Sequence, residues 1–123
     1  GTAEELFPLL QMLLNGGTYD GHRYIKPNTV QKFTTARRPG SPYALGFDRH
    51  RGKGKVGNVA DIAPLCTYGH TGFTGTCCWI DPQNEIVYIF LSNRGAPKRW
   101  NNQLSQLHIR TRIQEQIYRS LRG

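Results

Sequence analysis

The chain has 123 residues, of which 37% are apolar and 20% are charged, and its formal net charge is +8. This length and composition predict one folded domain over residues 1–123 and exclude a disordered or fibrous protein. No apolar run approaches the ~20 residues that cross a bilayer, and the basic residues are scattered without an aromatic platform, so we expect neither a membrane span nor a nucleic-acid partner.

A helix is predicted at the start of the chain. Thr2 and Glu5 have the spacing of a capping box, in which each side chain bonds the backbone of the other residue. The apolar residues that follow share one helical face, namely Leu6, Leu9, Leu10 and Leu13. The glycine pair at positions 16–17 ends the helix, and Pro8 is expected to bend its first turns because it removes a backbone donor.

A second, shorter helix is predicted within residues 24–33, which read YIKPNTVQKF. Pro27 would occupy the first helical position, where the missing N–H has no intrahelical partner in any case. Val30 and Phe33 should then point inward, and Lys26 is a poor cap.

Four strands are predicted next, over residues 41–49, 64–71, 76–81 and 86–93. A charged loop with several glycines follows the first of them, over residues 49–57, and residues 82–85 form a turn. The last strand is apolar on both faces, so layers of structure must cover both sides of the sheet.

The end of the chain is predicted to be helical, because apolar residues recur there at helical spacing: Leu104, Leu107, Ile113, Ile117 and Leu121. The order of elements predicts an α/β (α+β) fold in which helices flank an antiparallel β-sheet. The strand through His70 should pair with the strand through Trp79, which should pair with residues 86–93. The last helix should pack on this sheet through Ile113, Ile117 and Leu121.

The chain has three cysteines, Cys66, Cys77 and Cys78. An odd number cannot all pair in disulfide bonds, so we expect no disulfide framework and three free thiols. With His70 they make the one local cluster of residues that bind zinc. Cys77 and Cys78 are adjacent, and neighbours on a strand point to opposite faces, so they cannot both face one ion comfortably. We therefore expect no metal and no cofactor.

A glycine-rich run, YGHTGFTGT at residues 68–76, leads directly into a predicted strand. A phosphate-binding loop would need a different glycine spacing and a helix after it, so the run does not fit that function. Glycines at the end of a strand clear side chains away, which allows a ligand to lie against the strand edge and bond its backbone.

The run YGHTGFTGTCCWIDPQNEIVYIFLSNR (68–94), with LLQMLLNGGTYDGHRYIKPNTVQKFTT (9–35) and YALGF (43–47), resembles the carboxy-terminal part of serine β-lactamase-type hydrolases. These include penicillin-binding proteins, class C β-lactamases and related esterases. The resemblance covers nearly the whole chain and implies a partial β-lactamase/transpeptidase-like fold.

In that family a strand carries Lys-Thr-Gly or His-Thr-Gly, and His70, Thr71 and Gly72 match this motif. The resemblance implies that the backbone N–H of Phe73 contributes to an oxyanion hole and that Thr71 hydrogen-bonds the substrate. It also implies that His70 tunes the local charge and that Gly72 keeps the groove open. The alternative is an ordinary glycine-rich bend between two strands.

The chain departs from the family in lacking its other two motifs. No serine stands three residues before a lysine, as the nucleophile Ser-x-x-Lys requires, and no tyrosine stands two residues before an asparagine. Because acyl transfer needs an activated nucleophile for its first step, the sequence contains half of an active site.

Two hypotheses about function remain. In the first, the chain is the carboxy-terminal fragment of a periplasmic or cell-envelope serine hydrolase whose nucleophile lies in the missing amino-terminal part of the domain. In the second, it is a non-catalytic module that binds a peptide or glycan in the same groove. In the first case residues 86–93 would lack the neighbouring strand that the amino-terminal part supplies, so we expect a homodimer through that edge. The alternative is that the first helix, Thr2 to Asn15, covers the edge within one chain.

Overall fold

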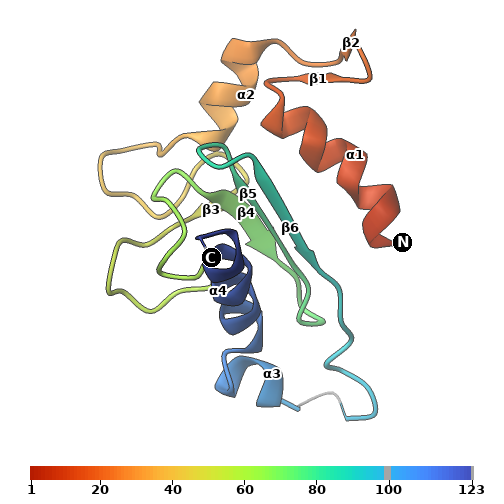
Figure 1. The fold of residues 1–123 in the computed structure, drawn as a ribbon, viewed down its shortest axis with the longest axis vertical. Helices are drawn as coiled ribbons and strands as arrows, with labels where there is room; N and C mark the ends of the chain where they lie inside the picture. Colours follow the sequence, from red (N-terminus) through yellow and green to blue (C-terminus); the bar gives the residue numbers. More distant parts are fainter. Residues whose placement is uncertain (99–100, 123) are drawn as a thin grey trace.

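The computed structural model describes residues 1–98 and 101–122, and Figure 1 shows its arrangement. The elements in chain order are α1 (Ala3–Leu14), β1 (Thr18–Tyr19), β2 (His22–Arg23), α2 (Pro27–Thr34), β3 (Asp48–Arg49), β4 (Tyr68–Thr71), β5 (Cys77–Asp81), β6 (Ile86–Phe90), α3 (Gln103–Gln106) and α4 (Ile109–Arg122).

Strands β3, β4, β5 and β6 form one antiparallel sheet in that order. Trp79 of β5 lies opposite Gly69 of β4 on one side and opposite Tyr88 of β6 on the other. The predicted pairing of these three strands is confirmed, as is the mixed fold class with an antiparallel sheet and helices. The sheet holds the glycine-rich run at the β4–β5 connection.

Helices cover the two faces of this sheet, as the apolar composition of β6 on both faces predicts. On one face, Leu10 of α1 packs with Tyr68 and Ile80. On the other face, Tyr118 of α4 packs with Trp79 and Tyr88. Alternate residues of β5 and β6 therefore enter opposite cores, which is the period of two expected of a strand that is covered on both sides.

Helix α1 begins as the sequence predicts. The hydroxyl of Thr2 accepts from the amide of Glu5 at 3.2 Å, and the carboxylate of Glu5 accepts from the amide of Thr2 at 3.3 Å. The helix continues through Pro8. Of the four predicted inward leucines, Leu9 is 53% exposed, so the buried face is narrower than the periodicity predicts.

A short hairpin, β1–β2, was not predicted. Its turn residues Asp20 and Gly21 have φ angles of +52° and +74°, the left-handed conformation that two-residue hairpin turns require. Asp-Gly is a strong sequence signal for such a turn, and it was available in residues 18–23.

Helix α2 has Pro27 at its first position, and Lys26 makes no side-chain capping bond, both as predicted. Val30 is buried, but Phe33 is 46% exposed, so the prediction that Phe33 points inward is wrong.

The predicted strand over residues 41–49 is mostly wrong, because residues before Asp48 form a turn instead. Gly46 has a φ of +78°, and the amide of Ala44 bonds the carbonyl of Phe47 at 2.9 Å. Arg49 then fixes the end of this segment, since its guanidinium donates to the carbonyls of Thr34 at 2.5 Å and Leu65 at 3.2 Å.

The carboxy-terminal helix is divided at His108, whose φ is +52°, and α4 presents a different face from the predicted one. Ile113 is 39% exposed and Leu121 is 65% exposed, whereas Gln114 and Tyr118 are buried. The cause lies in polar contacts: Gln114 accepts from the amide of Ala60 at 2.8 Å. Of the three predicted packing residues, Ile117 does pack against the core.

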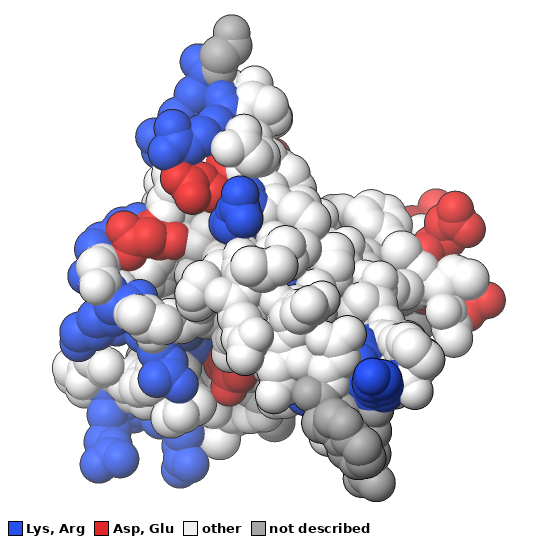
Figure 2. Space-filling view, turned by 90° about the horizontal axis from the view of Figure 1, so that it is seen from below, with Lys and Arg blue, Asp and Glu red and all other residues white. Residues whose placement is uncertain are grey.

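The three cysteines carry free thiols, of which that of Cys77 is buried. Among the described residues no three His, Cys, Asp or Glu side chains gather where they could hold a metal ion. Likewise, no helix in residues 1–98 and 101–122 has the length and apolar character needed to cross a membrane. On the face seen in Figure 2, basic side chains lie mainly to one side, with acidic ones among them, around a broad uncharged middle.

Candidate functional site

Strand β4 has an open edge beside the predicted motif. Its neighbour β3 is two residues long and pairs with Tyr68 and Gly69 alone. His70 and Thr71 pair with Cys78 and Cys77 of β5 on the inner side. Within the described residues, nothing pairs with the outer side of His70 and Thr71. The β3 side of β4 is therefore open beyond Gly69, and an open strand edge is a feature that an extended ligand can pair with.

Gly69 is a glycine because two strands approach closely there. A Cβ atom on Gly69 would lie 1.9 Å from the carbonyl oxygen of Cys78 and 2.8 Å from the indole ring of Trp79. Both neighbours belong to the sheet core, so neither can move aside cheaply.

We expect Gly69→Ala to lower the free energy of unfolding by about 2 kcal/mol, because overpacking a rigid site forces the strands apart. Urea denaturation should show this as a lower midpoint. Gly95→Ala is the matched control, because its Cβ would lie 3.4 Å from the flexible side chain of Asn93. Equal midpoints for the two variants would contradict the assignment of Gly69 to close strand packing.

The two later glycines of the run shape the β4–β5 hairpin. The amide of Gly72 donates to the carbonyl of Thr76 at 2.8 Å, and the amide of Gly75 donates to the carbonyl of Gly72 at 3.1 Å. Gly75 has a φ of +92°, and a Cβ there would lie 2.4 Å from the side chain of Leu104. The run is thus both a tight turn and a cleared strand edge.

The side chains of the motif are accessible. His70 and Gly72 are exposed, Thr71 is half-buried, and Phe73 is 67% exposed. Nδ1 of His70 lies 2.6 Å from the carbonyl oxygen of Thr71. A carbonyl oxygen can only accept, so Nδ1 carries the hydrogen, and in the neutral ring Nε2 is left as an acceptor.

The amide of Phe73 is available as a donor at the end of the open edge. Among residues 1–98 and 101–122 it donates to no acceptor. Its carbonyl oxygen, in contrast, accepts from Nε of Arg94 at 2.6 Å, and the guanidinium of Arg94 lies 5.4 Å from the centre of the Phe73 ring. The four predicted site residues, 70–73, are consecutive in the chain, and the amide of Phe73 lies at their end without an acceptor in the described residues.

Comparison with known proteins shows the family of the chain. A family profile described as Beta-lactamase matches residues 1–108, a range that includes β4 and the hairpin after it. The chain belongs to the β-lactamase family.

Two similar curated proteins come from Escherichia coli (strain K12) and Salmonella gallinarum. Over 86 residues, the first is 36% identical to this chain and the second is 35% identical. Both carry the name D-alanyl-D-alanine carboxypeptidase, and both names mark this activity as provisional. Each match covers 70% of this chain and 20% of the relative. The chain thus spans about a fifth of the length of the curated relatives it matches, and those relatives support membership of a serine hydrolase family.

The described part of this β-lactamase-family chain contains no activated serine. The hydroxyls of Ser41, Ser92 and Ser120 donate to backbone carbonyls, and that of Ser105 accepts from Arg110 at 3.5 Å. No serine in the described ranges hydrogen-bonds the side chain of a lysine or histidine, which would act as its base.

Cys77 and Cys78 do not replace the missing serine. Burial raises the pKa of the Cys77 thiol to about 11, although the positive charge of Arg110 lowers this pKa in part. Burial also raises the pKa of Cys78, opposed by a backbone hydrogen bond with His70. A reactive cysteine needs a lowered pKa, so both thiols stay protonated and inert at neutral pH.

Sequence reasoning missed Arg94 as part of the site of this β-lactamase-family chain. It follows the predicted strand 86–93 in the polar run "SNR" and lies 21 residues after Phe73. No local pattern marks an arginine in such a run as a partner of a distant turn. The sequence offered one signal for this role: Arg94 directly follows a predicted strand of the same sheet that carries the glycine-rich hairpin.

Proposed function

We propose that the chain is the carboxy-terminal part of a serine hydrolase domain of the β-lactamase family, which works with a nucleophile from another part of the same domain. The observation that supports this most is the open edge of β4, which ends at the unpartnered amide of Phe73. A substrate backbone laid along that edge would bring its reacting carbonyl close to this donor.

Each residue of the motif then has a role in that groove. The amide of Phe73 stabilises the negative charge on the substrate oxygen in the transition state, where a preorganised donor contributes about 3 kcal/mol. Thr71 hydrogen-bonds a carboxylate or carbonyl of the substrate. His70 sets the local charge from its exposed position, and Gly72 leaves the groove free of a side chain.

The substrate class follows from the family and from the names of the relatives. A β-lactam, a peptidoglycan peptide or an ester would each present a carbonyl to an acyl-enzyme mechanism. The relatives named D-alanyl-D-alanine carboxypeptidase favour a peptide that ends in D-alanine. Such a substrate places the protein in the periplasm or the cell envelope.

Residues 1–123 would fold as one unit within this larger domain. Its first partner is the amino-terminal part that supplies the nucleophile and base. The relatives are about five times as long as the matched segment, which leaves ample chain for that part.

A second function, a non-catalytic module that binds a peptide or glycan, is favoured by one observation. None of the serines in the described ranges hydrogen-bonds a lysine or histidine side chain, so the groove on its own would bind a ligand without cleaving it. In the first function the amino-terminal part adds a nucleophile and a base, and in the second no catalytic group is added.

The isolated chain is expected not to hydrolyse a chromogenic cephalosporin or a p-nitrophenyl ester above background, and a fluorescent penicillin should label none of its serines. A peptide ending in D-alanyl-D-alanine should still shift the amide resonances of Thr71, Gly72 and Phe73 in NMR spectra. The variant Thr71→Val should reduce these shifts, because valine keeps the shape of threonine and lacks the hydroxyl that bonds the peptide.

A labelled serine would show that the chain holds its own nucleophile, contrary to the proposal. Absence of any peptide-induced shift at Thr71 to Phe73 would rule out the groove. Joining the chain to an upstream segment with Ser-x-x-Lys should produce hydrolysis if the first function holds. Peptide binding without any gain in hydrolysis would select the second.

A further inference from the structure

The tip of the β4–β5 hairpin is held from outside the hairpin. Phe73 and Thr74 are both exposed, and within the hairpin the amides of Gly72 and Gly75 form the bonds that close the turn. An exposed two-residue tip held by so few bonds opens easily. Further contacts come from the segment after β6.

Ser92 Oγ donates to the carbonyl of Thr74 at 3.1 Å and Arg110 Nη1 to the carbonyl of Gly75 at 3.5 Å, while Arg94 makes the remaining outside contacts. Nε donates to the carbonyl of Phe73 at 2.6 Å, and the backbone amide of Arg94 donates to the carbonyl of Thr74 at 2.8 Å. The guanidinium lies over the Phe73 ring, and Nη1 donates to the side chain of Asn102 at 3.0 Å. The arginine thus links the hairpin tip to β6 and to the start of α3.

These bonds determine where the Phe73 amide points. The N–H and C=O of one peptide group point in opposite directions, because the group is planar and trans. The carbonyl of Gly72, which shares its peptide group with the Phe73 N–H, accepts from Gly75 on the inner side of the turn. The carbonyl of Phe73 is held by Arg94. With both flanking peptide groups held through their carbonyls, the Phe73 N–H is directed away from the turn.

We propose that Arg94 is the positioning residue of the Phe73 amide, the candidate oxyanion donor. This inference rests on the proposed function. Arg94 acts through geometry: a planar guanidinium stacks on the ring and donates to the carbonyl at once, whereas a lysine ammonium keeps the charge and lacks the rigid fork. A donor fixed before the reaction costs no reorganisation during it, which is the condition for a strong oxyanion hole.

The test compares Arg94→Gln and Arg94→Lys in the full 123-residue chain, with Arg119→Gln as the control. Arg119 is a fair control because its guanidinium bonds Glu115, on the exposed side of α4. NMR hydrogen exchange should show the Gly75 amide exchanging at least about tenfold faster in both Arg94 variants. Exchange in β5 and β6 should stay as in the wild type. In addition, the shift that a D-alanyl-D-alanine peptide causes at Phe73 should be lost, while the shift at Thr71 remains.

Unchanged exchange at Gly75 in Arg94→Gln would overturn the proposal. Full rescue by Arg94→Lys would also overturn it, because charge alone would then suffice. Equal acceleration throughout β5 and β6 would assign Arg94 a general structural role instead. If the wild-type chain shows no peptide shift at all, the proposed function fails, while exchange at Gly75 still decides whether Arg94 orders the hairpin.

Discussion

The isolated chain is expected to associate in solution, most simply as a two-fold dimer that joins β6 edges. β6 is the last strand of the sheet, and within the described residues its outer edge pairs with nothing. Residues 86–93 contain neither a charge nor a proline, the features that usually protect an exposed edge. Strand β6 is nevertheless covered on both faces, which is the setting of an interior strand. Exchange of a terminal segment between two chains would satisfy the same edge.

Helix α1 does not satisfy this edge within one chain. It packs through Leu10 onto Tyr68 and Ile80, on a face of the sheet, and Figure 1 shows it running beside β6. Apolar surface next to this edge is also uncovered, since Leu91, directly after β6, is 44% exposed. Surface of this kind, next to unpaired backbone groups, favours a partner.

Light scattering at several concentrations should report a mass that rises toward twice that of the chain. Leu91→Lys should shift the chain to monomer, because a charge at the end of the strand opposes pairing. Leu65→Lys is the control, since Leu65 is 53% exposed in a turn away from β6. A strict monomer in which the amides of Val87, Ile89 and Leu91 exchange slowly would show that the edge is covered internally.

Replacing Asp81 with alanine should lower the free energy of unfolding by about 3 kcal/mol, because several donors, among them the buried hydroxyl of Tyr118, lose their acceptor at once. Asp81 is 1% exposed at the end of β5. Its carboxylate accepts from the amides of Gln83 at 2.9 Å and Asn84 at 3.1 Å, and from the side chain of Asn84 at 2.8 Å. The hydroxyl of Tyr118 donates to it at 2.5 Å, which ties α4 to the β5–β6 turn.

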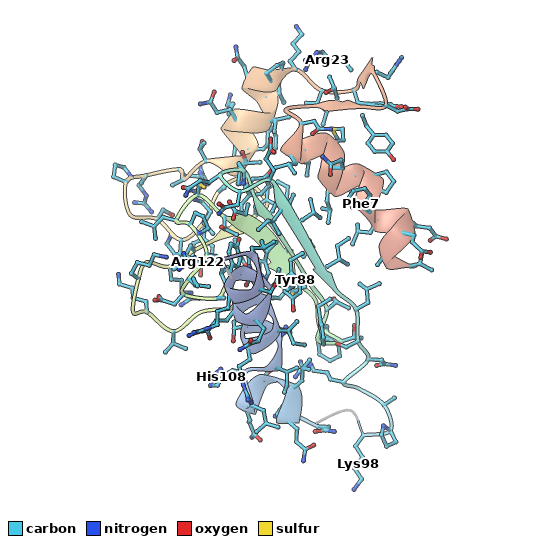
Figure 3. The ribbon with its side chains drawn as sticks, viewed as in Figure 1. Phe7, Arg23, Tyr88, Lys98, His108 and Arg122 are labelled. Carbon is cyan, nitrogen blue, oxygen red and sulfur yellow. The ribbon has the colours of Figure 1, made fainter. Side chains whose placement is uncertain are left out.

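Figure 3 labels Tyr88, which makes a second tie of the same kind, since its hydroxyl donates to the carbonyl of Arg110 at 3.0 Å. Burial, followed by the hydrogen bond and charge of Asp81, raises the pKa of Tyr118. The phenol therefore stays a hydrogen-bond donor at neutral pH. Loss of the carboxylate leaves this hydroxyl buried without its hydrogen-bond partner. The expected loss of unfolding free energy therefore exceeds that of a typical substitution at the surface.

Urea denaturation of Asp81→Ala, Tyr118→Phe and the double variant should give a coupling free energy of about 1.5 kcal/mol or more between the two side chains. Glu115→Ala is the control on the same helix. Its exposed ion pair with Arg119 should contribute no more than about 0.5 kcal/mol. A loss below about 1 kcal/mol in Asp81→Ala would contradict the role of this carboxylate as the anchor of α4.

Local patterns in the sequence determined the features of this protein that depend on neighbouring residues. The capping box of Thr2 and Glu5, the proline that opens α2 and the strand order from β4 to β6 are all present as predicted. The glycine-rich run also stands at the end of a strand, as predicted, because its glycines act on the backbone where they stand. Capping and strand alternation act over a few residues, so they can be recognised without the rest of the fold.

Tertiary structure alone decided which of several possible faces each element buries. Helix α4 turns Gln114 and Tyr118 inward because Ala60 and Asp81, far away in the chain, supply their hydrogen-bond partners. Periodicity favoured Ile113 and Leu121, since it counts apolar residues and takes no account of a polar side chain that finds a buried partner. The contact of Arg94 with the hairpin tip is of the same kind. Contacts between residues far apart in the chain depend on where the sheet places both segments, and that placement is a property of the whole fold.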